Sequence, residues 1–276
     1  MDCVEIKSGE ARLHVGNVAG CSTVVGSQSR NPLRLLTPRA RGESVWAYTS
    51  SFGGGMVAGD CTRLEIKIDS GTRCFLSTQA STKIYRNPES LPCSHETLSN
   101  LGDDALLIFA PDPVQCFADS SYEQRQRFTL AATSNLVLVD WLSAGRTARG
   151  ERWNFRRYVS RNEIVRDGKK LLVDALRLDR NDGALDSKYR GGQFNCIATV
   201  VMLGPKLIEH ARSGLNWCAA QAITPGASLV FAASPLHEGA ILRFAGTSIE
   251  EVGKAIHARL DFIGELLEDN PWSQKW

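Results

Sequence analysis

The sequence predicts a mainly β fold, in which two sheets are wound into a β-helix-like or sandwich architecture, with about two α-helices, one of them near the C-terminus. Three observations favour it: apolar and polar residues alternate at the period of a half-buried strand, strand–turn–strand units recur, and only two segments have helical periodicity. No low-complexity segment or linker is visible in the 276 residues, so we expect a single domain spanning 1–276.

The strands are indicated by two kinds of apolar pattern. Strict alternation predicts half-buried strands at 64–68 and 127–130. Denser apolar runs, with Gly, Asp, Asn or Pro between many of them, predict further strands at 105–109, 136–139, 197–203 and 228–232.

A weak internal repeat connects several of these strands. Residues 64–78, 96–109 and 127–141 are each predicted as strand, turn and strand, with turns near positions 71, 102 and 134. A spacing of about 31–32 residues is typical of stacked supersecondary units. A β-sandwich meander gives the same pattern, so the sequence leaves both arrangements open.

Two segments are predicted as helices. The first lies at 206–212 and extends toward 221. The second follows Ser248 and Glu251, which have capping-box spacing. Behind them an apolar stripe at helical spacing is formed by Ile249, Val252, Ile256, Leu260, Ile263 and Leu267. Such a stripe more often docks on its own domain than on a partner.

Composition and charge exclude several classes of protein. The 32 basic and 30 acidic side chains give a net charge of +2, so we expect neither a nucleic-acid nor a membrane-surface partner. The eight cysteines form no C-x-x-C pair and no two of the five histidines have ligand spacing, which favours free thiols in a reducing compartment. The start of the chain shows no signal or transit pattern and no apolar run reaches ~20 residues, so we expect a cytoplasmic protein.

The segment 52–60, Phe-Gly-Gly-Gly-Met-Val-Ala-Gly-Asp, is rich in glycine but is not a phosphate loop. A phosphate loop needs Gly-Lys-Ser/Thr opening a helix, whereas this segment contains no Lys and leads into a strand. We expect its glycines to allow positive φ angles and close packing, with Asp60 at the rim.

Three polar segments each follow the second strand of a repeat unit: 77–83, 111–113 and 140–146. If the units stack, these segments lie at the same end of adjacent coils and their polar groups converge. Asp140 and Glu151 would offer two carboxylates for general acid–base catalysis, but no His, Cys or Ser nucleophile arrangement accompanies them.

These segments resemble the UreD (UreH) family of urease accessory proteins. The matching stretches keep their order across roughly 50–205, and they are 53–60, 77–86, 111–117, 140–151 and 176–178. The form Pro-Asp-Pro-Val-x-Cys-Phe at 111–117 is similar to the eukaryotic branch of the family. The resemblance implies two sheets wound in a β-helical manner, with two helices.

The resemblance also implies a function. It implies a complex with UreF-type and UreG-type accessory proteins and with apo-urease, and an internal passage for nickel. The positions that match the polar passage are Asp60, Thr78, Gln79, Thr82, Asp140 and Glu151. No catalytic residue and no tightly bound cofactor is implied, since nickel is only in transit.

The chemistry of nickel agrees with such a role. Imidazole and thiolate bind Ni²⁺ strongly and would trap it, whereas oxygen ligands can admit and release it. Cys61 and Cys116 are interpreted as packing residues. The sequence is therefore interpreted as a non-enzymatic scaffold or metallochaperone. The alternatives are a carbohydrate-binding or structural β module, which needs an exposed aromatic platform, and a hydrolase using Asp140 and Glu151.

Overall fold

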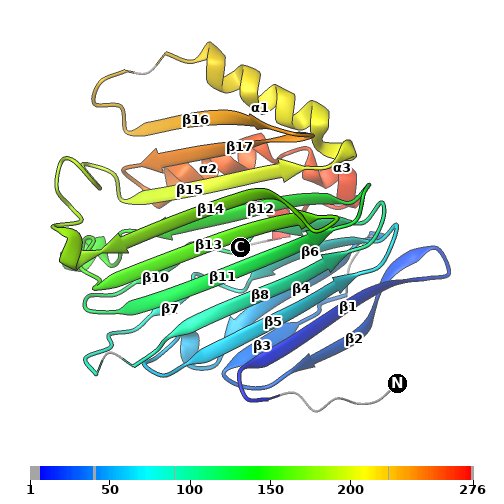
Figure 1. Ribbon diagram of the computed structural model, residues 1–276, viewed down its shortest axis with the longest axis horizontal. Coiled ribbons are helices and arrows are strands. Elements are labelled where there is room, and N and C mark those ends of the chain that lie inside the picture. The colour runs from blue at the N-terminus through cyan, green and yellow to red at the C-terminus, as the bar shows by residue number, and fades with distance from the viewer. Residues whose placement is uncertain (1–6, 40–41, 90, 223, 275–276) are drawn as a thin grey trace.

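Two β-sheets face one another, and helices cover the far side of one of them (Figure 1). The computed structural model describes residues 7–39, 42–89, 91–222 and 224–274. The predicted mainly β architecture with two wound sheets is confirmed.

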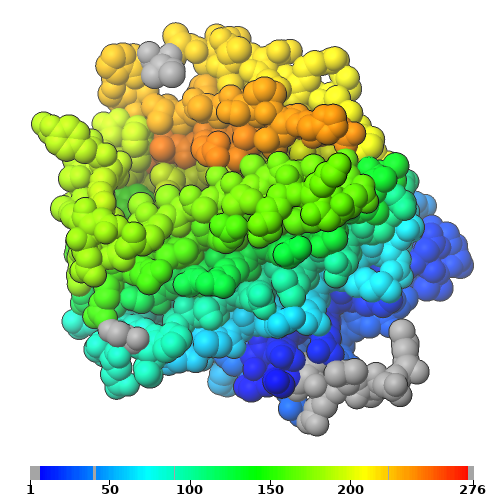
Figure 2. All heavy atoms as spheres, viewed as in Figure 1, coloured from blue at the N-terminus to red at the C-terminus, as the bar shows by residue number. Residues whose placement is uncertain are grey.

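The first sheet, called sheet A, has seven strands in the spatial order β14-β13-β11-β8-β5-β1-β2. Their bounds are β1 Glu10–Val18, β2 Cys21–Ser29, β5 Cys61–Ile68, β8 Ser94–Leu101, β11 Ser121–Leu130, β13 Arg157–Arg166 and β14 Lys169–Asp179. Its outer face fills the centre of the view in Figure 2. Charged side chains such as Arg63, Glu65 and Lys67 alternate with buried residues along its strands.

The second sheet, sheet B, has the order β16-β17-β15-β12-β9-β6-β4-β3, and the short strands β7 and β10 join it beside β12. The bounds are β3 Leu33–Leu36, β4 Val45–Ser51, β6 Arg73–Thr78, β7 Lys83–Ile84, β9 Leu106–Phe109, β10 Val114–Cys116, β12 Asn135–Ser143, β15 Cys196–Leu203, β16 Leu229–Leu236 and β17 Gly239–Gly246. Every predicted strand segment lies in one of the two sheets.

The internal repeat is a set of stacked coils and not a meander. Each unit has its first strand in sheet A and its second in sheet B. The neighbours that stacking creates run parallel: β5, β8 and β11 in sheet A, and β6, β9 and β12 in sheet B. One coil leads from Leu64 to its partner Thr97, and a later one leads from Leu107 to Leu136. The predicted turns stack closely, because a Cβ on Gly102 would lie 2.7 Å from the Ser70 nitrogen.

Both predicted helical regions are helical, and three helices result. Helix α1 spans Ile208–Ala220, and the C-terminal stripe is divided between α2 (Ile249–Arg259) and α3 (Ile263–Leu267). Half of the predicted capping box forms: Ser248 Oγ accepts from the Glu251 N–H at 3.1 Å. The Glu251 carboxylate instead accepts from Ser228 Oγ at 2.6 Å, which ties α2 to the segment before β16.

The C-terminal stripe packs on sheet B, as its pattern predicted. Five of its six apolar residues are buried in the cluster between this sheet and the helices: Val252, Ile256, Leu260, Ile263 and Leu267. No helix among the described residues is long and apolar enough to cross a membrane.

Two further apolar clusters lie on the inner side of the coils. One contains Leu64, Leu107 and Leu138, and the other, toward the opposite end of the strands, contains Met56, Tyr122 and Leu142. The positions between these clusters carry polar side chains. This interruption of the core is where the candidate site lies.

Candidate functional site

Two rows of polar side chains cross the inner face of sheet A. Side chains two residues apart share a face of a strand, and the parallel register aligns neighbouring strands. The first row is Thr62, His95, Gln124 and Ser160. The second row is Thr97, Gln126 and Asn162, and the apolar Leu64 occupies its position on β5. Except for half-buried His95, all of these polar side chains are buried. The rows pair internally, since Gln126 Nε2 donates to Asn162 Oδ1 at 2.8 Å.

Asp140 meets these rows from sheet B. On β12 it follows Leu136 and Leu138 at the inward positions, so its carboxylate enters the space between the sheets. Three donors of sheet A reach it: Gln124 Nε2 to Oδ1 at 2.7 Å, Ser160 Oγ to Oδ2 at 2.6 Å, and Asn162 Nδ2 to Oδ2 at 2.7 Å.

The environment of Asp140 opposes ionisation overall. Burial raises the pKa of this carboxyl above its ordinary value, although the three hydrogen bonds act in the opposite direction. A carboxylate offers about four lone-pair positions, and three of them are occupied here. Asp140 can therefore give a passing cation one weak contact and not a cage.

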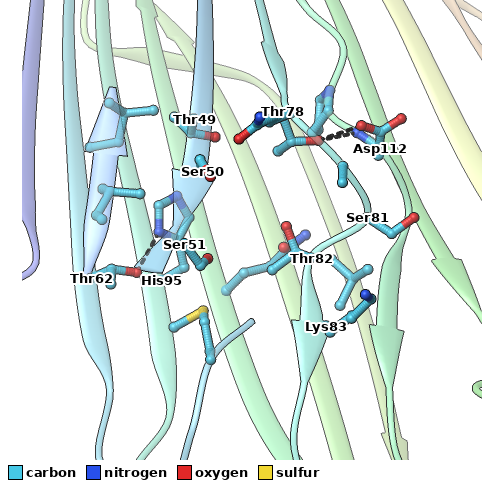
Figure 3. Close-up of a pocket in the computed structure, with 18 of the residues that line it drawn as sticks. Thr49, Ser50, Ser51, Thr62, Thr78, Ser81, Thr82, Lys83, His95 and Asp112 are labelled. Carbon is cyan, nitrogen blue, oxygen red and sulfur yellow. Dashed lines mark hydrogen bonds between the residues drawn. The ribbon is translucent and has the colours of Figure 1, made fainter. Parts of the chain in front are cut away.

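The polar layer borders a cavity of about 200 Å³, called the inner cavity. It is lined from sheet B by segments 78–83 and 111–112 and by Asp140, which confirms that the three polar segments converge. Thr78 and Asp112 hold two of these segments together: Thr78 Oγ1 donates to Asp112 Oδ2 at 2.8 Å and accepts from the Asp112 N–H at 2.7 Å (Figure 3). Lys83 also lines this cavity, with its side chain exposed.

His95 lines the inner cavity from sheet A, and the sequence analysis missed it. One ring nitrogen, Nδ1, lies 2.8 Å from Thr62 Oγ1, and the other, Nε2, lies 3.0 Å from Thr97 Oγ1. Burial lowers the pKa of His95 to about 4, so the ring is neutral at pH 7. Alternation along 94–97, with His95 and Thr97 both inward, was the signal that could have identified it.

A second space also borders Asp140, and we call it the side groove. It measures about 730 Å³ and runs between β14 and the strands β15, β16 and β17. Asp140 and Trp141 line both the inner cavity and the side groove. Farther along this groove, Arg243 Nη2 donates to Asp174 Oδ1 at 2.6 Å.

The six predicted passage residues separate into two groups. Thr78, Gln79, Thr82 and Asp140 line the inner cavity, whereas Asp60 and Glu151 line neither it nor the side groove. Asp60 Oδ2 accepts from the Val57 N–H at 2.9 Å and closes a turn in the glycine-rich segment.

The glycines of this segment have the backbone roles that were predicted. Gly53 and Gly59 adopt positive φ angles of 82° and 89°. Gly55 needs its small size, because a Cβ there would lie 2.7 Å from the Lys83 carbonyl oxygen. The segment is therefore fitted tightly against the chain that leads into β7.

Glu151 forms a structural ion pair. Arg146 binds its carboxylate with two nitrogens, Nε at 2.9 Å from Oε2 and Nη2 on Oε1, and the Ala118 N–H donates to Oε2 at 3.2 Å. Hydrogen bonding to Arg146 lowers the pKa of Glu151, so it stays ionised. The hydrolase hypothesis needs Asp140 and Glu151 at one site. Glu151 lines neither the inner cavity nor the side groove, so this hypothesis lacks its second carboxylate.

Other predicted features have mixed outcomes. Cys116 is buried and packs as expected, but the interpretation of Cys61 as a packing residue is wrong: strand alternation turns it outward and it is exposed. The described tryptophans are buried or half-buried, which leaves them unsuited to a carbohydrate platform. Within 7–39, 42–89, 91–222 and 224–274, no three or more His, Cys, Asp or Glu side chains are grouped to hold a metal ion.

Comparisons with known proteins give a consistent result. A family model described as UreD urease accessory protein matches residues 7–275. A UreD urease accessory protein from Sorangium cellulosum is 43% identical over 273 residues, which cover 98% of this chain and 85% of the relative. Plant relatives named urease accessory protein D are also similar: the one from Arabidopsis thaliana is 39% identical over 201 residues, 71% of this chain and 68% of its own length, and that from Oryza sativa subsp. indica is 38% identical over 200 residues, 71% and 65%.

Proposed function

Because this chain belongs to the UreD family of urease accessory proteins, we propose that it is a non-enzymatic scaffold that passes nickel through its interior into apo-urease. It acts in a complex with UreF-type and UreG-type proteins. Nickel is the cargo of this complex and not a resident cofactor.

The observation that carries the proposal is the position of Asp140. It lines both the inner cavity and the side groove, so one carboxylate borders the two spaces. The apolar clusters on either side of this layer consist mainly of hydrocarbon side chains, and burial raises the pKa of their cysteines Cys74, Cys93 and Cys116, which keeps these thiols protonated and makes them poor ligands. A cation that crosses between the sheets is therefore expected to pass Asp140.

The ligands available along this route suit transit. Hydroxyl, amide and carboxylate oxygens of Thr78, Gln79, Thr82 and Asp140 line the inner cavity. Each is a modest ligand for Ni²⁺, and conduction needs contacts weak enough to release the ion. Asp60 and Glu151 act at a distance from this route, by holding the glycine-rich segment and the loop after β12 in place.

Asp140→Ala and Asp140→Asn test the proposal. Both remove the charge, and the Asn variant keeps the side-chain volume. In the reconstituted complex with UreF-type and UreG-type proteins and apo-urease, we expect several-fold less nickel per urease active site, while the yield of the complex in pull-downs is unchanged. Metal analysis of the isolated urease gives the nickel content.

Glu151→Ala is the matched control. Because Glu151 pairs with Arg146 outside both spaces, its loss should lower the melting temperature but should not reduce nickel delivery per folded complex. Full nickel loading by both Asp140 variants would rule out a passage along Asp140, whatever the partners of the protein.

A further inference from the structure

We propose that His95 is a transient nitrogen ligand for Ni²⁺ in the inner cavity and gives the passage its preference for nickel over hard divalent cations. This inference rests on the proposed function, since it names the residue that selects the cargo. It also changes the expected chemistry of the route, which the sequence suggested to be lined by oxygen.

The position of His95 places an imidazole on the wall of the cavity. The ring comes from β8 of sheet A and lies across the space from Thr78, Thr82 and Asp112 of sheet B (Figure 3). Its register neighbour on β11 is Gln124, whose Nε2 donates to Asp140 at 2.7 Å. His95, Gln124 and Asp140 therefore follow one another along the wall, in the direction of the side groove.

The contacts of the ring keep it ready for a metal ion. Thr62 and Thr97 hold the two ring nitrogens, and a hydroxyl can serve as donor to one nitrogen or acceptor from the other. A Ni²⁺ ion that takes the lone pair of one nitrogen displaces one hydroxyl. The remaining threonine still accepts from the opposite N–H, which is the outer contact that metal-bound histidines usually have.

A single imidazole is enough to discriminate between ions without trapping nickel. Nitrogen ligands favour Ni²⁺ over Mn²⁺ in the usual affinity order, whereas Mg²⁺ and Ca²⁺ prefer oxygen. No cluster of three or more ligating side chains surrounds His95 among the described residues. Nickel thus gains one stronger contact in the cavity and can still leave it.

Nuclear magnetic resonance of the purified complex with UreF-type and UreG-type proteins tests the inference. The chain carries only five histidines, so ¹⁵N labelling of histidine gives a simple spectrum, and labelling of glutamine adds the Gln124 amide as a second reporter. Nickel chloride is added below one equivalent. We expect paramagnetic broadening of the His95 ring and Gln124 amide signals, and the same broadening in His237→Asn, which removes an imidazole whose side chain is 86% exposed and open to surface binding of nickel.

The outcomes separate the inference from the proposed function. Paramagnetic broadening reaches both His95 and its neighbour Gln124, so the variant separates them: broadening of Gln124 that persists unchanged in His95→Asn at the same nickel concentration would overturn the role of His95 and leave the passage standing. Absence of broadening at both would overturn the passage as well. Magnesium chloride, added in large excess over nickel, should not restore the broadened His95 signals, and their recovery would overturn the claimed preference.

His95→Asn tests the same inference by measuring nickel delivery. Asparagine can keep one hydrogen bond to a neighbouring threonine but presents no imidazole. We expect several-fold less nickel per urease active site at limiting nickel, with complex yield unchanged, whereas His237→Asn should match the unmodified protein. Equal nickel delivery by His95→Asn at limiting nickel would contradict the proposal.

Discussion

Asp140 and His95 are ionisable side chains in the same polar layer, and burial acts against the charged form of both. It raises the pKa of Asp140 and lowers that of His95 to about 4. Because this layer favours neutral groups, it affects how a cation moves through it. Its neutral imidazole presents no positive charge to an approaching cation, and its carboxylate gains from a cation that balances its charge.

The stability of the protein should depend on His95 in acid. The unfolded chain binds a proton on this ring below about pH 6.5, whereas the folded protein does not bind it until about pH 4. The contribution of His95 to the free energy of unfolding is therefore fully present above pH 6.5. It is lost as the pH falls from about 6.5 to about 4, by up to roughly 3 kcal/mol.

Urea denaturation of the unmodified protein and His95→Asn between pH 7.5 and 4 measures this loss. As the pH falls, the unmodified protein should lose more free energy of unfolding than His95→Asn. The two proteins share all other titrating groups, so the difference between them reports His95 alone. Parallel curves would mean that His95 titrates normally in the folded protein.

Only part of the site was predictable from single residues. Thr78, Gln79, Thr82 and Asp140 stand in segments that match the family, and the structure brings them to one cavity. Alternation along 94–97 places His95 on the inward face, but its position beside Gln124 depends on the register between β8 and β11, which the local pattern does not encode. Glu151 looked equivalent to Asp140 in sequence, but Arg146, five residues earlier, binds it.

At the scale of elements, the C-terminal stripe fastens α2 and α3 to sheet B. Ile256 is 2% exposed, whereas Lys254 on the same helix points to solvent. Ile256→Ala should lower the free energy of unfolding by about 2–5 kcal/mol, because it leaves a cavity in a packed core. Lys254→Ala should change it by at most about 0.5 kcal/mol.

Thermal or urea unfolding of the two variants checks this prediction, and pull-downs with the partner proteins accompany it. If Ile256→Ala instead kept full stability and lost only complex formation, α2 would serve a partner and not the fold.

Alternation predicted where strands lie but not how they pair. The same apolar and polar pattern fits a coil or a meander. In a meander consecutive strands pair antiparallel, whereas in a coil strands about thirty residues apart in sequence pair parallel. The parallel pairing of Cys74 with Leu107 decides for the coil. The division of the C-terminal stripe into α2 and α3 was likewise invisible, because its apolar spacing continues through the bend after Leu260.

For the whole molecule, the coiled architecture explains why the polar segments meet. Each turn of the coil returns the chain to the same end of sheet B, so segments 78–83 and 111–112 line one cavity with Asp140. The apolar clusters on either side supply the stability that the polar layer does not. The central claim is that nickel travels through this space.

Plugging the inner cavity tests that claim most directly. Ser81 is half-buried on the wall of the inner cavity, and Ser81→Trp should fill much of its ~200 Å³. Ser187→Trp, half-buried away from the inner cavity and the side groove, is the matched control. The measurement is nickel per urease active site in the reconstituted complex. The account predicts a several-fold loss for Ser81→Trp at unchanged complex yield and no loss for Ser187→Trp, and full loading by Ser81→Trp would contradict it.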